Sequence, residues 1–251
     1  MSTDKTEFTL DYSILKVPAE GGKNHTILIT TSLKTSTFVI QETDHQVVTL
    51  DILATYLDGP ITPDKFTSGL ISRMGGKVDT LNKSVKLTKG SVEVVPCMQG
   101  FGVGTFLFNQ VVCWAKKHDP QLQVVPIKVA YTDATEDNQI RRNKFYASFS
   151  IYFSDSPTNE GVVDAHSIPM RIADLTPHQS QKNKMQEQSV EQTLRQMCEE
   201  QYELEKQIRE LTQSLQGKDR VIAQRDRSKA RVVRTFLIII GVLCLALLWR
   251  W

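Results

Sequence analysis

Residues 91–118 carry the clearest structural signal in the chain and read SVEVVPCMQGFGVGTFLFNQVVCWAKKH. The valine-rich run from Ser91 to Met98 predicts a strand, because β-branched side chains fit a pleated, half-buried surface. The segment from Gln99 to Thr105 holds three glycines, which predict a tight turn. Apolar residues from Phe106 to His118 then recur at helical spacing. The sequence therefore predicts a strand, a glycine-rich turn and a helix in direct succession.

This succession suits the binding of an anionic group. Glycines let backbone N–H groups approach a pyrophosphate closely, and the first turn of a helix adds positive potential. Two nucleotide-binding motifs do not fit. A Rossmann fingerprint requires G-x-G-x-x-G, whereas Gly100, Gly102 and Gly104 follow G-x-G-x-G, and a Walker loop requires a Gly-Lys-Ser/Thr that these residues lack. A simple tight turn without a ligand remains the alternative.

The turn and a later segment together resemble the GNAT superfamily of N-acetyltransferases. The family's pyrophosphate loop follows Arg/Gln-x-x-Gly-x-Gly/Ala, which Gln99, Gly102 and Gly104 match, and Pro96 stands where the family often has proline. Residues 141–151, RRNKFYASFSI, are similar to the family's later helix, which ends Phe-Tyr-x-x-Leu-Gly-Phe. A weaker similarity places Met170 and Arg171 at the Met-Arg of the family's last strand. The resemblance implies an α/β fold, more closely an α+β mixed sheet of GNAT type.

The resemblance also implies a reaction, the transfer of an acetyl (acyl) group from acetyl-CoA (acyl-CoA) to an amine. A backbone N–H of Val94 or Val95 would polarise the thioester carbonyl, and Tyr146 would protonate the departing thiolate. Glu93 would deprotonate the incoming amine, directly or through water. The alternatives are a core tyrosine at 146 and a solvated glutamate at 93. The residues that the resemblance implies for cofactor binding are Val94, Val95, Gln99, Gly100, Phe101, Gly102, Val103, Gly104, Thr105, Asn138 and Gln139.

Composition sets limits on partners and metals. The net charge of +2 is near neutral, so no nucleic-acid partner is expected. The four cysteines share no zinc or redox spacing and the five histidines are scattered, so no metal site is expected. A reducing compartment fits this cysteine usage.

One globular domain is expected at residues 1–175, a GNAT-like acyltransferase domain followed by a polar linker at 176–189. The remaining elements expected in the domain are strands at 26–31, 36–41, 77–79, 84–87, 122–131, 150–153 and 166–172, and helices at 47–57, 63–74 and 136–149.

A coiled coil with a basic C-terminal flank is expected at residues 190–230. Apolar residues alternate in steps of three and four, as coiled-coil a and d positions do. The a positions are Leu194, Gln201, Ile208, Leu215 and Ile222, and the d positions are Val190, Met197, Leu204, Leu211 and Lys218. The narrow seam predicts a homo-oligomer, with one amphipathic helix docked on its own domain as the alternative. The homo-oligomer is expected to be parallel, because all its chains would enter the membrane at the same end.

A transmembrane helix is expected at residues 232–249. The run from Phe236 to Trp249 carries no charge, and lysines and arginines precede it. The positive-inside rule then places the globular domain in the cytoplasm, held by a single-pass C-terminal anchor. The resulting prediction is a membrane-tethered N-acyltransferase of unknown acceptor. The alternative is a non-catalytic membrane-anchored coiled-coil adaptor with a degenerate acyltransferase domain.

Overall fold

The structure is a computed structural model that describes residues 5–62, 65–66, 69–89, 92–130, 136–154, 159–178 and 185–248. Side chains are not described at 136–137, 221, 223–224 and 242–248. The chain divides into two compact units, Met1–Val190 and Glu191–Trp251.

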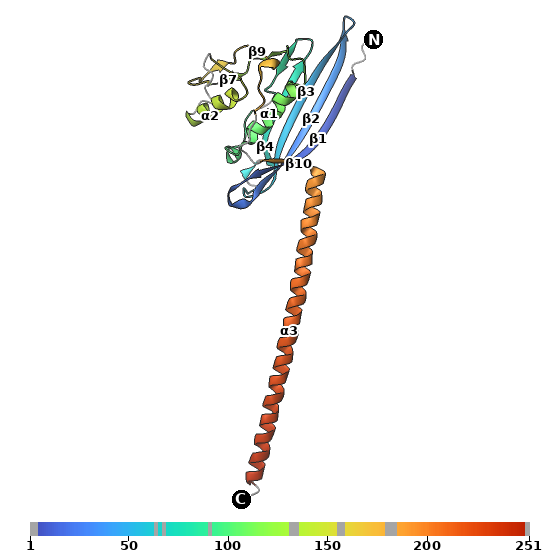
Figure 1. Ribbon diagram of the computed structural model, residues 1–251, viewed down its shortest axis with the longest axis vertical. Coiled ribbons are helices and arrows are strands. Elements are labelled where there is room, and N and C mark those ends of the chain that lie inside the picture. Colours follow the sequence, from blue (N-terminus) through green and yellow to red (C-terminus); the bar gives the residue numbers. More distant parts are fainter. Residues whose placement is uncertain are drawn as a thin grey trace. The chain divides into compact units, whose positions relative to one another are not determined.

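The first unit is built on a mixed sheet of eight strands in the order β10-β1-β2-β3-β4-β5-β6-β9. Neighbouring strands are antiparallel except β5 and β6, which are parallel. In Figure 1 the long strands β1 to β4 run side by side as a meander. The strands are β1 (Lys5–Pro18), β2 (Asn24–Ile40), β3 (Thr43–Asp58), β4 (Leu70–Asp79), β5 (Ser84–Lys86), β6 (Gln123–Val124), β9 (Met170–Arg171) and β10 (Gln186–Ser189). A separate pair is formed by β7 (Lys128–Val129) and β8 (Ala165–His166).

Strand β3 shows why the meander forms. From Val48 to Tyr56 its buried side chains alternate with partly exposed ones, which is the period of a strand with one covered face. The turn before it, Gln41–Glu42, has positive φ at both residues (49° and 66°). Two such residues twist a hairpin in the direction that paired strands require. The helix predicted at 47–57 is therefore wrong, because buried residues recur at every second position, which is the period of a strand and not of a helix.

Helix α1 (Val103–Ala115) packs on β4. Its buried residues include Leu107, Phe108 and Val111, which join the main core. A Cβ on Gly76 of β4 would lie 2.5 Å from the Trp114 ring. Glycine in the strand therefore lets the helix come close to the sheet.

Other expected elements are present with changed bounds. The described part of the strand predicted at 91–98 is an extended segment, followed by the short helix η4 (Pro96–Met98). The strand predicted at 122–131 is broken into β6 and β7, and the predicted helix at 136–149 is α2 (Glu136–Ala147). The second part of the helix predicted at 63–74 belongs to β4, while residues 63, 64, 67 and 68 lie outside the description. Two further short helices are η1 (Glu20–Gly22) and η6 (Ile172–Asp174).

The predicted linker contains a strand of the sheet. β10 pairs antiparallel with β1, from Ser13 opposite Ser189 to Lys16 opposite Gln186. Ser13 Oγ also donates a 2.6 Å hydrogen bond to Glu187 Oε1. The folded unit therefore continues past residue 175 to the end of β10.

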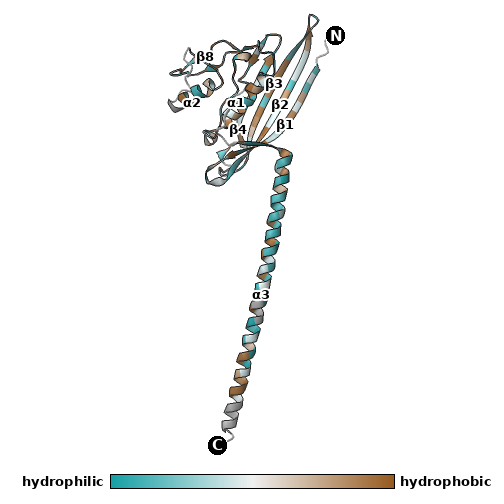
Figure 2. Cartoon of the chain, viewed as in Figure 1, coloured by the Kyte–Doolittle hydropathy of each residue, from teal (hydrophilic) through white to brown (hydrophobic). Residues whose placement is uncertain are grey.

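Helix α3 (Val190–Leu248) forms the described part of the second unit from Glu191 onward. Figure 2 shows it as mostly hydrophilic, with single hydrophobic residues spaced along it and more of them just before the part of the helix that is drawn in grey.

The predicted transmembrane helix is corrected by the structure: among the described residues, no helix is long and apolar enough to cross a membrane. The part of the predicted span with described side chains runs only from Val232 to Gly241 and includes Arg234. A spanning helix needs about 20 predominantly apolar residues. The single-pass anchor and the cytoplasmic placement both depended on this span, so these predictions fail with it.

Candidate functional site

The glycine-rich turn leads directly into α1. Gly100 and Gly102 have φ of 85° and 81°, in the left-handed region, and Gly102 is the N-cap of the helix. The carbonyl of Gly102 accepts the first helical hydrogen bond, 3.0 Å from the Phe106 nitrogen. Glycine adopts this conformation without the steric cost that a Cβ brings. The sequence prediction of a turn and a helix in succession is confirmed here.

The turn is folded tightly onto the extended segment before it. Gln99 Nε2 donates a hydrogen bond of 2.9 Å to the Val94 carbonyl. A Cβ on Gly104 would lie 3.0 Å from Val94 Cγ2, so the first turn of α1 touches the same residue. The side chain of Gln99 therefore holds the turn closed.

The extended segment lies along β4. The Val95 N–H donates to the Ile71 carbonyl at 3.0 Å, and Ser72 Oγ donates to the Glu93 carbonyl at 2.7 Å. Val95 is thus engaged with the sheet, which leaves Val94 as the remaining predicted oxyanion donor. The Glu93 side chain is exposed, as a residue that acts on a substrate requires.

The parallel strands β5 and β6 lie before and after the glycine turn and α1 in the chain and are neighbours in the sheet. They pair at Ser84 with Gln123 and at Val85 with Val124, and Val125 N–H donates to the Val85 carbonyl at 2.8 Å. After β5 the chain continues to bond to β4, where the Lys89 N–H donates to the Gly75 carbonyl at 2.9 Å. After β6 the chain bonds to the residue that follows β8, where the Ile127 N–H donates to Ser167 Oγ at 2.9 Å.

Tyr146 lies in the aromatic packing between α1 and α2. Tyr146 is only 7% exposed. The centroid of its ring is 6.0 Å from that of Phe108, 5.1 Å from that of Phe145 and 5.3 Å from that of Phe153. Three edge-to-face contacts of this kind stabilise a core. The packing supports the structural role of the ring and leaves the acid role untested.

Asn138 and Gln139 make hydrogen bonds within α2 and to the segment around Val162. Asn138 Oδ1 accepts from Arg141 Nη2 at 2.9 Å, and Gln139 Nε2 donates to the Val162 carbonyl at 3.1 Å. Arg142 and Asn143 also donate to the Val162 carbonyl. These side chains hold the segment around Val162 onto α2.

A buried histidine packs on the turn, and the sequence prediction missed it. His25 is 1% exposed, and its ring centroid is 4.8 Å from that of Phe101. Its Nδ1 lies 3.4 Å from Tyr56 Oη, which also accepts a hydrogen bond of 3.1 Å from the Ile61 N–H. Among the described residues, His25 Nε2 has no hydrogen-bond partner. The signal was the alternation in β2, which puts His25 on the same buried face as Ile27 and Ile29.

Burial sets the protonation of this pair. It lowers the pKa of His25, because the charged imidazolium loses its hydration. It also raises the pKa of Tyr56, against the hydrogen bond from Ile61. Both side chains therefore favour their neutral forms.

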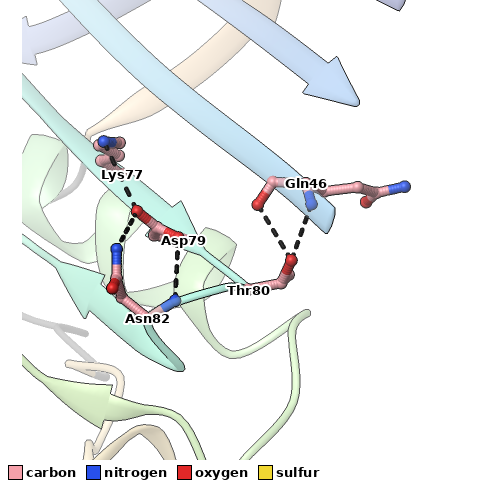
Figure 3. A network of polar contacts seen from close by, with 5 residues as sticks. All are labelled: Gln46, Lys77, Asp79, Thr80 and Asn82. Carbon is pink, nitrogen blue, oxygen red and sulfur yellow. Dashed lines mark hydrogen bonds and ion pairs between the residues drawn. The ribbon is translucent and has the colours of Figure 1, made fainter. Parts of the chain in front are cut away.

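The opposite end of β4 carries a separate polar network (Figure 3). Thr80 Oγ1 accepts a 2.7 Å bond from the Gln46 N–H, and Asp79 accepts bonds from the backbone and side chain of Asn82. A surface hollow of about 300 Å³ lies beside it, lined by residues that include Lys83 and His118. The network fixes the turn between β4 and β5, and neither feature includes a residue of the glycine turn.

Comparison with known proteins adds no relative. No family model matches the chain, and no curated protein or solved structure shows significant similarity to it. Among the residues that the structure describes, no cluster of three or more His, Cys, Asp or Glu side chains is arranged to hold a metal ion.

Proposed function

We propose that the first unit is an acyl-CoA-dependent N-acyltransferase whose glycine turn binds the pyrophosphate of the cofactor. The observation that carries this proposal is the unit of β5, glycine turn, α1 and parallel β6. The GNAT resemblance implies a strand, the glycine loop, a helix and a further strand in this order, with the first strand at 91–98, where the structure has the extended segment that bonds to β4. The acceptor is an amine whose identity the site does not define.

The turn supplies the chemistry that a pyrophosphate needs. Two left-handed glycines bring the chain to the start of α1, where the first backbone N–H groups have no partner within the helix. A helix N-terminus carries the equivalent of about half a positive charge, which favours a phosphate group. A Cβ added to Gly100 would meet no heavy atom within 4 Å, so a ligand can approach the backbone there.

The catalytic roles follow from what remains accessible. Glu93 is exposed and serves as the base. With the Val95 N–H bonded to Ile71, the oxyanion donor of the proposal is the Val94 N–H. The acid role of Tyr146 requires its hydroxyl to reach the thiolate from the edge of the aromatic packing.

A second candidate is a binding module without catalysis. Two observations favour it: the Tyr146 ring packs among three phenylalanines, and the Val95 N–H is used by the sheet. In this candidate the turn still binds CoA, but no acyl group is transferred.

Calorimetry on the full chain with acetyl-CoA separates the candidates. Gly102→Asp should abolish binding, because it adds a negative charge where the phosphates lie. Gly21→Asp is the matched control, since Gly21 has the same φ of 81° at an exposed turn with no atom near its Cβ. Binding that survives Gly102→Asp and Gly104→Asp contradicts the site.

Turnover is then measured on a panel of amines. Tyr146→Phe should leave CoA binding nearly unchanged and slow transfer by about 100- to 10,000-fold, the usual effect of losing a general acid. Tight CoA binding without turnover on any amine supports the binding module. A folded wild-type chain that does not bind CoA refutes both candidates.

A further inference from the structure

Helix α3 exposes an apolar seam. We define the heptad seam as the a and d positions from Met197 to Ile222. Every large apolar member of it is more than half exposed: Met197 59%, Leu204 59%, Ile208 62%, Leu211 65%, Leu215 61% and Ile222 57%. A strict a/d stripe is narrower than the face that a helix turns toward a globular core, and it is typical of a coiled-coil partner.

We propose that a second copy of this chain covers the heptad seam, with the two α3 helices running antiparallel. The heptad repeat argues for a partner helix with the same repeat, because each a or d side chain must fit between side chains of the facing helix along the whole contact. A second copy of the chain has the same sequence and therefore the same heptad repeat. This proposal does not depend on the proposed acyltransferase activity.

The polar members of the seam argue against the parallel arrangement. In a parallel pair in register, each seam residue faces itself, so Lys218 would meet the Lys218 of the second copy. Glu200 at a g position would also lie opposite Glu205 at the e position of the second copy. Both contacts place like charges together and destabilise that arrangement. The parallel prediction had depended on a shared membrane entry, and no helix within the described part of the chain is long and apolar enough to cross a membrane.

The antiparallel arrangement pairs these polar residues with each other. With the two-fold axis between Arg209 and Glu210, Gln201 faces Lys218 of the second copy. The amide oxygen of Gln201 is an acceptor for the Lys218 ammonium group. Every other layer is then apolar on both sides: Met197 with Ile222, Leu204 with Leu215, and Ile208 with Leu211.

The charges outside the seam agree with this direction. Residues 191–210 contain six glutamates and three lysines or arginines, a net charge of −3. Residues 211–234 contain seven lysines or arginines and two aspartates, a net charge of +5. Antiparallel helices about 8–10 Å apart bring the acidic half onto the basic half. That spacing is near the screening length of about 8 Å in physiological salt, so part of the attraction persists.

Disulfide cross-linking of the full chain tests the arrangement. Leu204→Cys and Leu215→Cys are made separately in a background of Cys113→Ser, Cys198→Ser and Cys244→Ala, and one carries a mass tag. Oxidation of their mixture should give mixed dimers at least several-fold above the dimers of either variant alone. Tyr202→Cys mixed with Leu215→Cys is the matched control, because Tyr202 is 64% exposed on the outer side of the helix, and it should stay unlinked. Leu204→Cys that links to itself shows parallel pairing and overturns the proposal.

A charge substitution gives an independent result. Gln201→Glu should lower the dimer Kd by about threefold in sedimentation equilibrium, because the new carboxylate faces Lys218 of the second copy. The same substitution in a parallel pair would bring two carboxylates together and raise the Kd. A raised Kd, or a wild-type chain that sediments at its monomer mass of 28.4 kDa, overturns the proposal.

Discussion

The imidazole of His25 and the phenyl ring of Phe101 meet nearly at right angles, with centroids 4.8 Å apart and planes at 79°. His25 belongs to β2, whereas Phe101 stands between the two left-handed glycines of the turn. This contact therefore connects the glycine turn to β2, which is remote from the turn in sequence. It is one of the contacts that hold the proposed phosphate site on the sheet.

Phe101→Ala should loosen the turn. The substitution removes a partly buried ring and its edge-to-face contact, so the free energy of unfolding should fall by about 2 kcal/mol, below the 3–5 kcal/mol typical of a fully buried phenylalanine. Urea unfolding measures this change. Phe8→Ala is the control, since Phe8 is 65% exposed, and it should change stability by less than about 0.5 kcal/mol. Equal losses in the two variants would show that the contact does not stabilise the domain.

Stability should fall as the pH drops below about 6.5, the ordinary pKa of histidine. Burial lowers the pKa of His25 and of His118 in the folded chain, so the unfolded chain binds more protons in this range. The stability that each neutral ring contributes is complete above its unfolded pKa and declines as the pH falls toward its folded pKa. The slope is at most about 1.4 kcal/mol per pH unit for each group. Urea unfolding between pH 7.5 and 5.5 should give a smaller slope for His25→Gln with His118→Gln than for the wild type, and an unchanged slope would contradict the assignment.

Local signals in the sequence were strong enough to predict the second half of the domain in outline. The glycine turn, α1 and most of α2 stand where predicted, because their breakers and helical periods lie within short windows. The first half was misjudged where apolar residues were dense. In β3 the helix prediction ignored the strict alternation from Val48 to Tyr56. In β4 the segment is a strand because it pairs with β3.

The candidate site was predictable only where a turn defines it. Gln99 and the glycines are visible in the sequence, but the bond of Val95 to Ile71 joins two segments that are 24 residues apart in the chain. The packing of Tyr146 likewise depends on Phe108 of another helix. Such contacts arise from tertiary structure, so a motif alone does not reveal whether its residues are free to act.

Gly76→Ala should destabilise the domain by displacing α1. The new Cβ would lie 2.5 Å from Trp114 Cζ3 and 3.0 Å from the Lys86 carbonyl oxygen, so the helix or the strand must shift. Overpacking of this kind costs about 1–3 kcal/mol. Gly217→Ala is the control with the opposite sign, because Gly217 lies in α3 with no atom near its Cβ and alanine is the better helix former by about 1 kcal/mol. Thermal unfolding of both variants measures the difference, and a neutral Gly76→Ala would show that α1 tolerates the added group.

Asn159 should be among the least replaceable polar residues of the domain. It is fully buried, and its φ of 54° is one that asparagine adopts more readily than most residues. Its Oδ1 accepts a 2.8 Å bond from the Phe153 N–H, and its Nδ2 donates to the Ile151 carbonyl at 2.9 Å. Asn159→Ala leaves both backbone groups without a partner in the core, and it also places alanine in a strained conformation.

The two effects can be separated by a second variant. Asn159→Gly keeps the left-handed backbone at no steric cost but loses the same hydrogen bonds. Each unsatisfied buried group costs about 1–3 kcal/mol, so Asn159→Gly should lose about 2–4 kcal/mol of unfolding free energy. Asn159→Ala should lose about 1 kcal/mol more, the cost of a non-glycine residue in the left-handed region. Urea unfolding at pH 7.5 gives both values. If alanine proves no worse than glycine, the backbone at residue 159 relaxes out of the left-handed region, and the loss belongs to the hydrogen bonds alone.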